Sequence, residues 1–139
     1  KTVDQISRTT AESVTKAVQQ GLLSGNSIDE IANNISSIAA FGQGRSQLIA
    51  RTESARAINL SSVSAYQQAE KETGLKIYKE WLSSRDDKVR ETHEKLDGRS
   101  IPVDEEFEID GFFANAPAAF EEAAEDCNCR CTVIPKIIK

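Results

Sequence analysis

The sequence predicts an α+β fold, in which a helical N-terminal half is followed by a small antiparallel sheet with short helices. Apolar residues recur at helical spacing through the first half, and at Leu75 their period changes from that of a helix to that of a strand. The last stretch is rich in β-branched residues, which favour strands. We expect residues 1–44 to form an N-terminal helical region, and residues 45–139 to pack with it as one unit.

Two helices are expected in the first 44 residues. The first should end at Gly21, and its apolar stripe comprises Val3, Ile6, Val14, Ala17 and Val18. Ser27 and Glu30 have the spacing of a capping box, in which each side chain bonds to the backbone of the other residue. The second helix should begin there, because a series at helical spacing follows: Ile28, Ile31, Ala32, Ile35, Ile38 and Ala39.

A third and longer helix should run from about residue 45 to residue 72 and end at Gly74. Small side chains are frequent along it, namely Ala50, Ala55, Ala57, Ser61, Ser62, Ser64 and Ala65. Because small side chains let another element approach closely, we expect this helix to be central to the fold.

A strand is predicted from Leu75, with Leu75, Ile77 and Trp81 on one face and Lys76, Tyr78 and Glu80 on the other. The stretch "SSRDD" should end this strand. A short helix should follow it, because Val89, His93 and Leu96 lie at helical spacing and Asp97-Gly98 can close the helix.

The rest of the chain is expected to alternate short extended pieces with one more helix. "SIPVD" and "FEID" should be extended, and Asn115 or Pro117 could open a helix that runs to Glu125. The final stretch, "CNCRCTVIPKIIK", should be a strand that includes the cysteines.

Composition limits the classes of function. The chain has 139 residues and a formal net charge of −5, whereas a dedicated nucleic-acid binder usually has a concentrated basic face. No apolar run is long enough to span a bilayer, and the N-terminus lacks an apolar signal core. The three cysteines cannot all pair within the chain, which favours a reducing compartment. The chain begins without Met, so we expect it to be a fragment.

Cys127, Cys129 and Cys131 occupy alternate positions, so in an extended segment they project from one face. Neighbouring side chains would then lie roughly 6.5–7 Å apart, at the limit for a disulfide. A straight strand does not bring three sulfurs to one zinc ion, although a site that includes His93 remains open. Buried free thiols are the favoured interpretation. A metal site and an oxidised or catalytic thiol are the alternatives.

Two further stretches of the chain carry charged residues that could take part in chemistry. Arg51 and Glu53 lie on the third helix, where structural ion pairs are favoured over an active-site pair. Carboxylates cluster between residues 86 and 97, and they could bind a divalent cation or act in acid–base chemistry. Basic residues are interleaved with them, however, which is typical of a solvated helix face.

Three segments in order carry a resemblance to a known family: "IARTESARAIN", then "WLSSRDDKVRETHEKLDGRSIPVDEEF", then "NCRCTV". This pattern resembles the phage head morphogenesis domain, also described as the phage Mu protein F-like or SPP1 gp7-like minor head protein family. The resemblance covers roughly residues 45–135. The residues that match its motifs are Arg51, Thr52, Glu53, Asp86 or Asp87, Val89, Arg90, His93, Leu96, Asp97, Gly98, Asn128, Cys129, Arg130 and Cys131.

Some family members carry a C-x2-C pair in the middle motif and H-P-N-C-R-C at the end, which looks like a metal knuckle. This chain has Arg90 and His93 at the positions of the pair, and Asp126 near that of the terminal His. The ligand-capable residues that it keeps are His93, Cys129 and Cys131, with Cys127 as a replacement. No cofactor is therefore expected, and one structural zinc ion is the alternative.

The resemblance implies a non-catalytic minor capsid component that associates with portal and capsid proteins in the virion interior, after assembly in the host cytoplasm. Non-specific contact with DNA is a further implication, and membrane contact is not expected. Arg51 and Glu53 would tie the third helix to the loop at Asp97-Gly98. The rival is a nuclease or thiol hydrolase that uses His93 with Arg51, Glu53 or Cys129. Family domains also occur beside other modules, including toxins, and any activity would then lie outside this chain.

Overall fold

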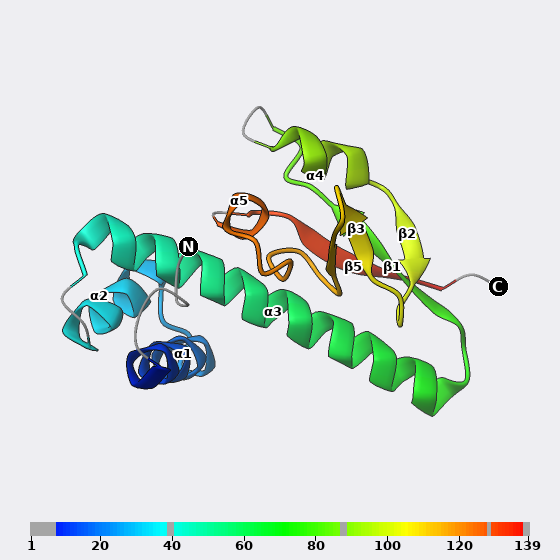
Figure 1. The fold of residues 1–139 in the computed structure, drawn as a ribbon. Coiled ribbons are helices and arrows are strands. Elements are labelled where there is room, and N and C mark those ends of the chain that lie inside the picture. Colours follow the sequence, from blue (N-terminus) through cyan, green and yellow to red (C-terminus); the bar gives the residue numbers. More distant parts are fainter. Residues whose placement is uncertain (1–7, 39–40, 87–88, 128, 138–139) are drawn as a thin grey trace.

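The structure is a computed structural model that describes residues 8–38, 41–86, 89–127 and 129–137. The expectations for Val3, Ile6, Ala39, Asp87 and Asn128 lie outside these residues. Within them, helices fill the N-terminal half and small antiparallel sheets follow, so the predicted α+β class is confirmed. Figure 1 shows the long helix α3 running beneath the sheets, with α1 and α2 packed at one end of it.

The N-terminal core is built by α1 (Arg8–Leu23), α2 (Ile28–Ile38) and the start of α3. The predicted capping box opens α2, since the Ser27 N–H donates to Glu30 Oε1 (2.9 Å) and the Glu30 N–H donates to Ser27 Oγ (3.1 Å). The core contains part of the apolar series predicted for these helices, together with two residues of α3: Val14, Val18, Ile31, Ala32, Ile35, Ile49 and Ala50. Ile28 is partly buried against this core and Ala17 is half-buried, whereas Ile38 at the end of α2 is 40% exposed, so its predicted place in the core is wrong.

Gly21 does not end the first helix, which continues to Leu23. Gly25 follows the helix with a φ of 72°, in the left-handed region that glycine adopts readily. Gly21 is instead buried against α2, where an added Cβ would lie 2.5 Å from Ile31 Cγ1. The glycine therefore permits close packing of α1 on α2.

The helix α3 (Gln43–Thr73) has 31 residues and spans about 46 Å. Gly74 ends it as predicted, with a φ of 72° and its N–H donated to the Glu70 carbonyl. The helix contributes Ile49 and Ala50 to the N-terminal core and Val63 to a second core. The buried residues of this second core are Val63, Trp81, Leu96, Val103, Phe107, Ile109, Ala114, Ala116, Ala118, Phe120, Cys129, Cys131 and Val133. It is thus the central element that the sequence predicted.

Three antiparallel strands form the main sheet in the order β2-β1-β5. They are β1 (Ile77–Leu82), β2 (Ser100–Pro102) and β5 (Thr132–Ile137). Alternate residues of β1 are buried, but they include Lys79 as well as Ile77 and Trp81. Leu75 precedes the strand and is 48% exposed, so its predicted place on the inner face is wrong. Trp81 packs edge-on against Phe107 in the second core.

The region between the sheet strands differs from the sequence-based expectation. A hairpin of β3 (Phe107–Ile109) and β4 (Phe112–Ala114) extends the "FEID" segment. No helix opens at Asn115 or Pro117, because Ala118 and Glu121 have positive φ values that interrupt it. The helix α5 is limited to Ala123–Asp126.

The backbone of β5 has one edge that does not face β1. Val133 pairs with Trp81, whose N–H is donated to the Arg99 carbonyl on the opposite side of β1. In an antiparallel pair the backbone groups of such residues point away from each other, so those of Val133 point to the outer edge.

Side chains of α3 cover this outer edge. The Tyr66 hydroxyl donates to the Val133 carbonyl (3.1 Å), and Asn59 Nδ2 donates to the Cys131 carbonyl (3.2 Å). Pro135, two residues beyond Val133, has no N–H to present there. The contacts fix α3 against the sheet and also fix the chain just before β5.

Candidate functional site

His93 lies in α4 (Glu91–Leu96) and faces the second core. It is 1% exposed, and its ring centroid is 5.4 Å from that of Trp81. Leu96, three residues later on the same face, is also buried, as the predicted helical spacing requires. Val89 precedes the helix and is half-buried. His93 is therefore an interior residue.

Two of the three cysteines meet His93. Its Nδ1 atom lies 3.6 Å from Cys129 Sγ and 3.5 Å from Cys131 Sγ, and both cysteines are 4% exposed. These three donor atoms all lie within 4.8 Å of one another, and they form the one potential metal-binding group found among the described residues. We call this group the Cys/His cluster.

The predicted alternation holds for Cys129 and Cys131, which share one face, but not for the whole segment. Cys127 is half-buried and lies outside the Cys/His cluster, so the structure does not bring this replacement candidate together with the other three residues. Its carbonyl instead accepts a hydrogen bond from Arg90. The cysteines also precede β5, which begins at Thr132, and Cys127 lies in the turn directly after α5.

Glu125 and Thr92 complete the surroundings of His93. Glu125 Oε1 lies 3.1 Å from His93 Nε2, and the Thr92 hydroxyl donates to the same oxygen (2.8 Å). Sequence reasoning missed both residues, since Thr92 was given no role and Glu125 was expected only as the end of a helix. Its 32-residue separation from His93 gave no local signal.

The pKa values of the two thiols in the Cys/His cluster are shifted in opposite directions. The hydrogen bond from Cys131, followed by the contact with His93, lowers the pKa of Cys129 to about 5, although burial acts against this. The hydrogen bond with Cys129, together with burial, raises the pKa of the Cys131 thiol above its ordinary range. The cluster therefore favours one thiolate, on Cys129, in contact with a thiol that retains its proton.

The motif residues of α3 have other partners than those predicted. Thr52 is buried, while Arg51 is exposed. Glu53 accepts two hydrogen bonds of 2.9 Å from Arg56, one turn along the helix. Asp97 accepts the Ser83 N–H (2.9 Å) and pairs with Arg85 (3.0 Å), so it is held within the connection from β1 to α4 rather than by α3.

Arg56 and Asn59 carry the link that was expected of Arg51. Arg56 Nε donates to the Ala118 carbonyl (2.8 Å), and its Nη2 lies 3.3 Å from Asp126 Oδ2. Asn59 Nδ2 donates to the Pro117 carbonyl (3.3 Å) in addition to that of Cys131. The i, i+3 spacing of Glu53 and Arg56 was a signal in the sequence that could have drawn attention to Arg56.

The carboxylates of the middle motif form ion pairs. Asp86 accepts two hydrogen bonds from Arg130, at 2.7 and 2.8 Å, across the fold. This fork is the geometry in which arginine binds a carboxylate strongly. Gly98 has a φ of 80° and donates its N–H to the Trp81 carbonyl, so it closes α4 as predicted.

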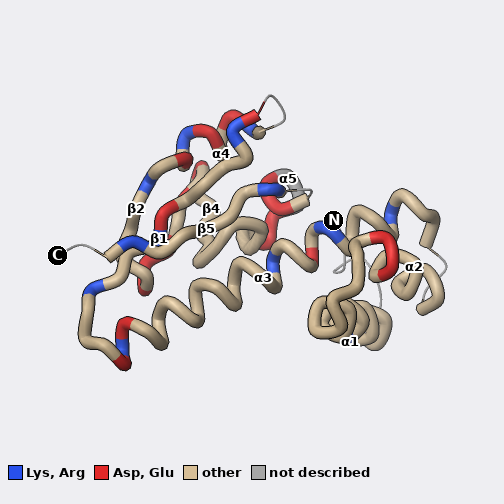
Figure 2. Tube along the Cα trace, turned by 180° about the vertical axis from the view of Figure 1, so that it is seen from behind, with Lys and Arg blue, Asp and Glu red and all other residues tan. Residues whose placement is uncertain are grey.

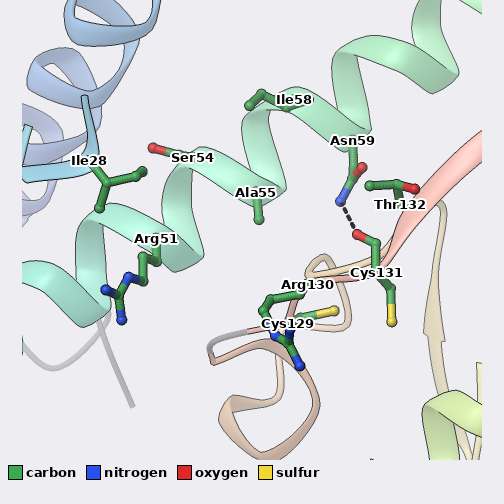
Figure 3. Close-up of a pocket in the computed structure, with 10 residues that line it drawn as sticks. All are labelled: Ile28, Arg51, Ser54, Ala55, Ile58, Asn59, Cys129, Arg130, Cys131 and Thr132. Carbon is green, nitrogen blue, oxygen red and sulfur yellow. Dashed lines mark hydrogen bonds between the residues drawn. The ribbon is translucent and has the colours of Figure 1, made fainter. Parts of the chain in front are cut away.

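A cavity of about 660 Å³ lies between α3 and the segment that carries the cysteines. Figure 3 shows Arg51, Ser54 and Asn59 on the helix side of it, and Cys129, Arg130 and Cys131 opposite. Ser54 Oγ is buried and has no hydrogen-bond partner there. Cys129 and Cys131 thus border the cavity, although each is only 4% exposed.

The charges of the described residues do not form a single basic face. Figure 2 shows basic and acidic residues interspersed over the C-terminal region, while much of α1 and α3 is uncharged. Among the described residues, no helix is long and apolar enough to cross a membrane.

These features define an α+β domain whose reactive side chains are enclosed in its second core. The chain belongs to the phage Mu protein F-like family, whose model matches residues 12–134. The resemblance found in the three sequence segments is therefore confirmed, and the match also includes most of the N-terminal helices.

Three relatives give the domain its context. The chain is 42% identical over 89% of its length to "NAD(+)--arginine ADP-ribosyltransferase EFV" of Enterococcus faecalis. It is 33% identical over 87% of its length to "Minor head protein GP7" of Bacillus phage SPP1. It is also 32% identical over 89% of its length to an uncharacterised protein of Haemophilus influenzae. The chain spans 25%, 39% and 24% of these proteins, respectively. No solved structure matches it significantly.

Proposed function

We propose that this chain is a structural domain of a phage or prophage minor head protein, and that it joins the portal and the capsid during assembly of the head. The observation that carries the proposal is the 33% identity to a minor head protein over 87% of the chain. The domain would then lie in the virion interior after assembly in the cytoplasm of the bacterial host. Its partners would be portal and capsid proteins.

The surroundings of the Cys/His cluster support a non-catalytic role. A thiol nucleophile must meet its substrate, yet Cys129 and its neighbour His93 are 4% and 1% exposed. The hydrogen bonds of Arg56 and Asn59 join α3 to the C-terminal region, so these groups serve packing. Non-specific DNA contact is a weaker candidate, because basic and acidic residues are interspersed.

The relative named as an ADP-ribosyltransferase fits the same proposal. This chain spans 25% of that protein, which leaves most of it to hold a separate catalytic domain. In our proposal the shared domain attaches such a protein to the phage head, and the transferase activity lies in the remaining part.

Head association can be tested by producing the full-length protein with the portal and capsid proteins of the same phage. The protein should sediment with the particles, and it should resist added protease until the particles are opened. A cytosolic protein of similar size and charge is the control for trapping. Failure to sediment with particles, or digestion in intact ones, would contradict the proposed role.

The non-catalytic part of the proposal has its own measurement. The chain alone should transfer no label from NAD⁺ to an arginine substrate, and it should show no salt-sensitive retardation of DNA in a gel. Label transfer by the chain would assign the activity of the relative to this domain. Retardation that salt abolishes would favour the DNA-contacting alternative.

A further inference from the structure

We propose that the Cys/His cluster is a zinc site, in which His93, Cys129 and Cys131 are the ligands and Glu125 is a positioning residue. The inference concerns the isolated domain and does not depend on its role in the phage head. It assigns a ligand to a group of side chains that head association by itself would not require.

The spacing of the donor atoms fits a tetrahedral zinc ion. With zinc bonds of about 2.3 Å to sulfur and about 2.0–2.1 Å to nitrogen, nitrogen and sulfur ligands lie roughly 3.5 Å apart. His93 Nδ1 lies 3.6 Å from Cys129 Sγ and 3.5 Å from Cys131 Sγ. No large rearrangement of the three side chains is therefore needed to admit the ion. A water molecule would complete the tetrahedron.

The position of Glu125 beside Nε2 leaves Nδ1 as the nitrogen of His93 for the metal. Glu125 Oε1 accepts a hydrogen bond from Thr92 and faces His93 Nε2, where an ionised carboxylate accepts the Nε2 proton. Nδ1 then has a free lone pair, which is directed at the two sulfurs. A carboxylate on the outer nitrogen of a histidine ligand is the usual arrangement in zinc sites, where it fixes the tautomer and the orientation of the ring.

The chemistry of the three donor atoms favours zinc over magnesium or calcium, and over a catalytic thiol. Two thiolates with one imidazole suit zinc, whereas magnesium and calcium prefer oxygen ligands. Two thiolates and a divalent zinc ion sum to zero charge, which suits a site whose protein ligands are at most 4% exposed. The same low exposure disfavours a catalytic thiol, which must be accessible to its substrate.

Metal content and ligand identity can be measured together. The protein is equilibrated with zinc chloride under reducing conditions, desalted and analysed by elemental mass spectrometry. Wild type should retain about one zinc per chain, whereas Cys129→Ser, Cys131→Ser and His93→Gln should lose most of it. The matched control is Cys127→Ser, which changes the same residue type in the same segment outside the Cys/His cluster and should retain zinc.

A second measurement does not rely on the folding of these variants. Replacement of zinc by Co²⁺ in wild type should give the absorption of thiolate-to-cobalt charge transfer and of a tetrahedral ion. Glu125→Gln should retain zinc at saturation but bind it roughly 10–100-fold more weakly, as measured by competition with a chromophoric chelator. A merely structural role of Glu125 would leave this affinity unchanged in a folded variant.

Several outcomes would overturn the proposal. Wild type without zinc, or with three titratable thiols and no cobalt spectrum, would show that the cysteines serve packing alone. Zinc lost equally from Cys127→Ser would refute the three-residue ligand set. Since all these measurements use the isolated chain, failure of the zinc proposal and failure of head association are distinguishable.

Discussion

At the scale of single residues, Lys79 is the least expected feature of the fold. It lies on the inner face of β1 and is completely buried. Its Nζ donates to the Asn115 carbonyl (2.7 Å) and lies 5.4 Å from the centre of the Phe107 ring. Burial lowers its pKa from 10.5 to about 8, although Glu106, Asp104 and Glu105 oppose this shift. The folded chain therefore gives up this proton more readily than the unfolded chain does.

The lowered pKa predicts a pH dependence of stability. Between about pH 8 and pH 10.5 the unfolded chain binds more protons at Lys79 than the folded chain. The free energy of unfolding should therefore rise with pH across this window, by at most about 1.4 kcal/mol per pH unit from this residue. Below pH 8 its contribution should be constant.

Urea unfolding of wild type and of Lys79→Met at several pH values isolates this contribution from other titrating groups. The difference in the free energy of unfolding between wild type and variant should increase in favour of wild type from pH 8 to pH 10.5. The Lys79→Met change retains an unbranched side chain in the core. A difference that does not vary with pH would show that Lys79 has an ordinary pKa.

At the scale of elements, α1 packs closely on α2 at Gly21. We expect Gly21→Ala to destabilise the protein by about 1 kcal/mol, because overpacking typically costs more than the helix propensity of alanine contributes. The new Cβ would lie 2.5 Å from Ile31 Cγ1 and 3.0 Å from its Cδ1. The urea midpoint should fall accordingly.

Gly44→Ala provides the matched control for this prediction. Gly44 lies in the first turn of α3, and an added Cβ would meet nothing within 4 Å. The same exchange should there stabilise the protein by up to about 1 kcal/mol, through helix propensity alone. If both variants were stabilised alike, the contact between α1 and α2 would be looser than described.

The elements also show which features sequence patterns could predict. Local signals succeeded, as at the Ser27–Glu30 box and at the end of α3, because the residues that decide such features are close in sequence. Alternation put Cys129 and Cys131 on one face but did not distinguish a strand from the extended chain before it. The partners Glu125 and Arg56 were missed, because their contacts join segments that come together only in the folded chain.

At the scale of the whole molecule, α3 connects two apolar cores. The first core surrounds Ile49 and Ala50, and the second contains Val63 and Trp81. A single continuous helix that takes part in both cores couples them, because local unfolding in the middle of this helix would disrupt the packing of each core. The expected unit of residues 1–44 and 45–139 remains a prediction, and unfolding experiments address it.

Trp81 makes this coupling measurable, because it is the single tryptophan of the chain and lies within the second core. Tryptophan fluorescence should report the second core, while far-ultraviolet circular dichroism should report mainly the helices. We expect the two urea transitions to coincide, as in two-state unfolding. Val14→Ala, in the first core, should shift both midpoints equally. Separate midpoints would show that the cores unfold independently.

The covered outer edge of β5 affects how copies of this chain behave when they are crowded together. An uncovered strand edge is a template on which another copy of the same chain can add its own strand. Here Tyr66 and Asn59 occupy outer carbonyls of this edge and its neighbouring segment, and Pro135 removes a donor. Copies held at high local concentration would therefore not polymerise through β5.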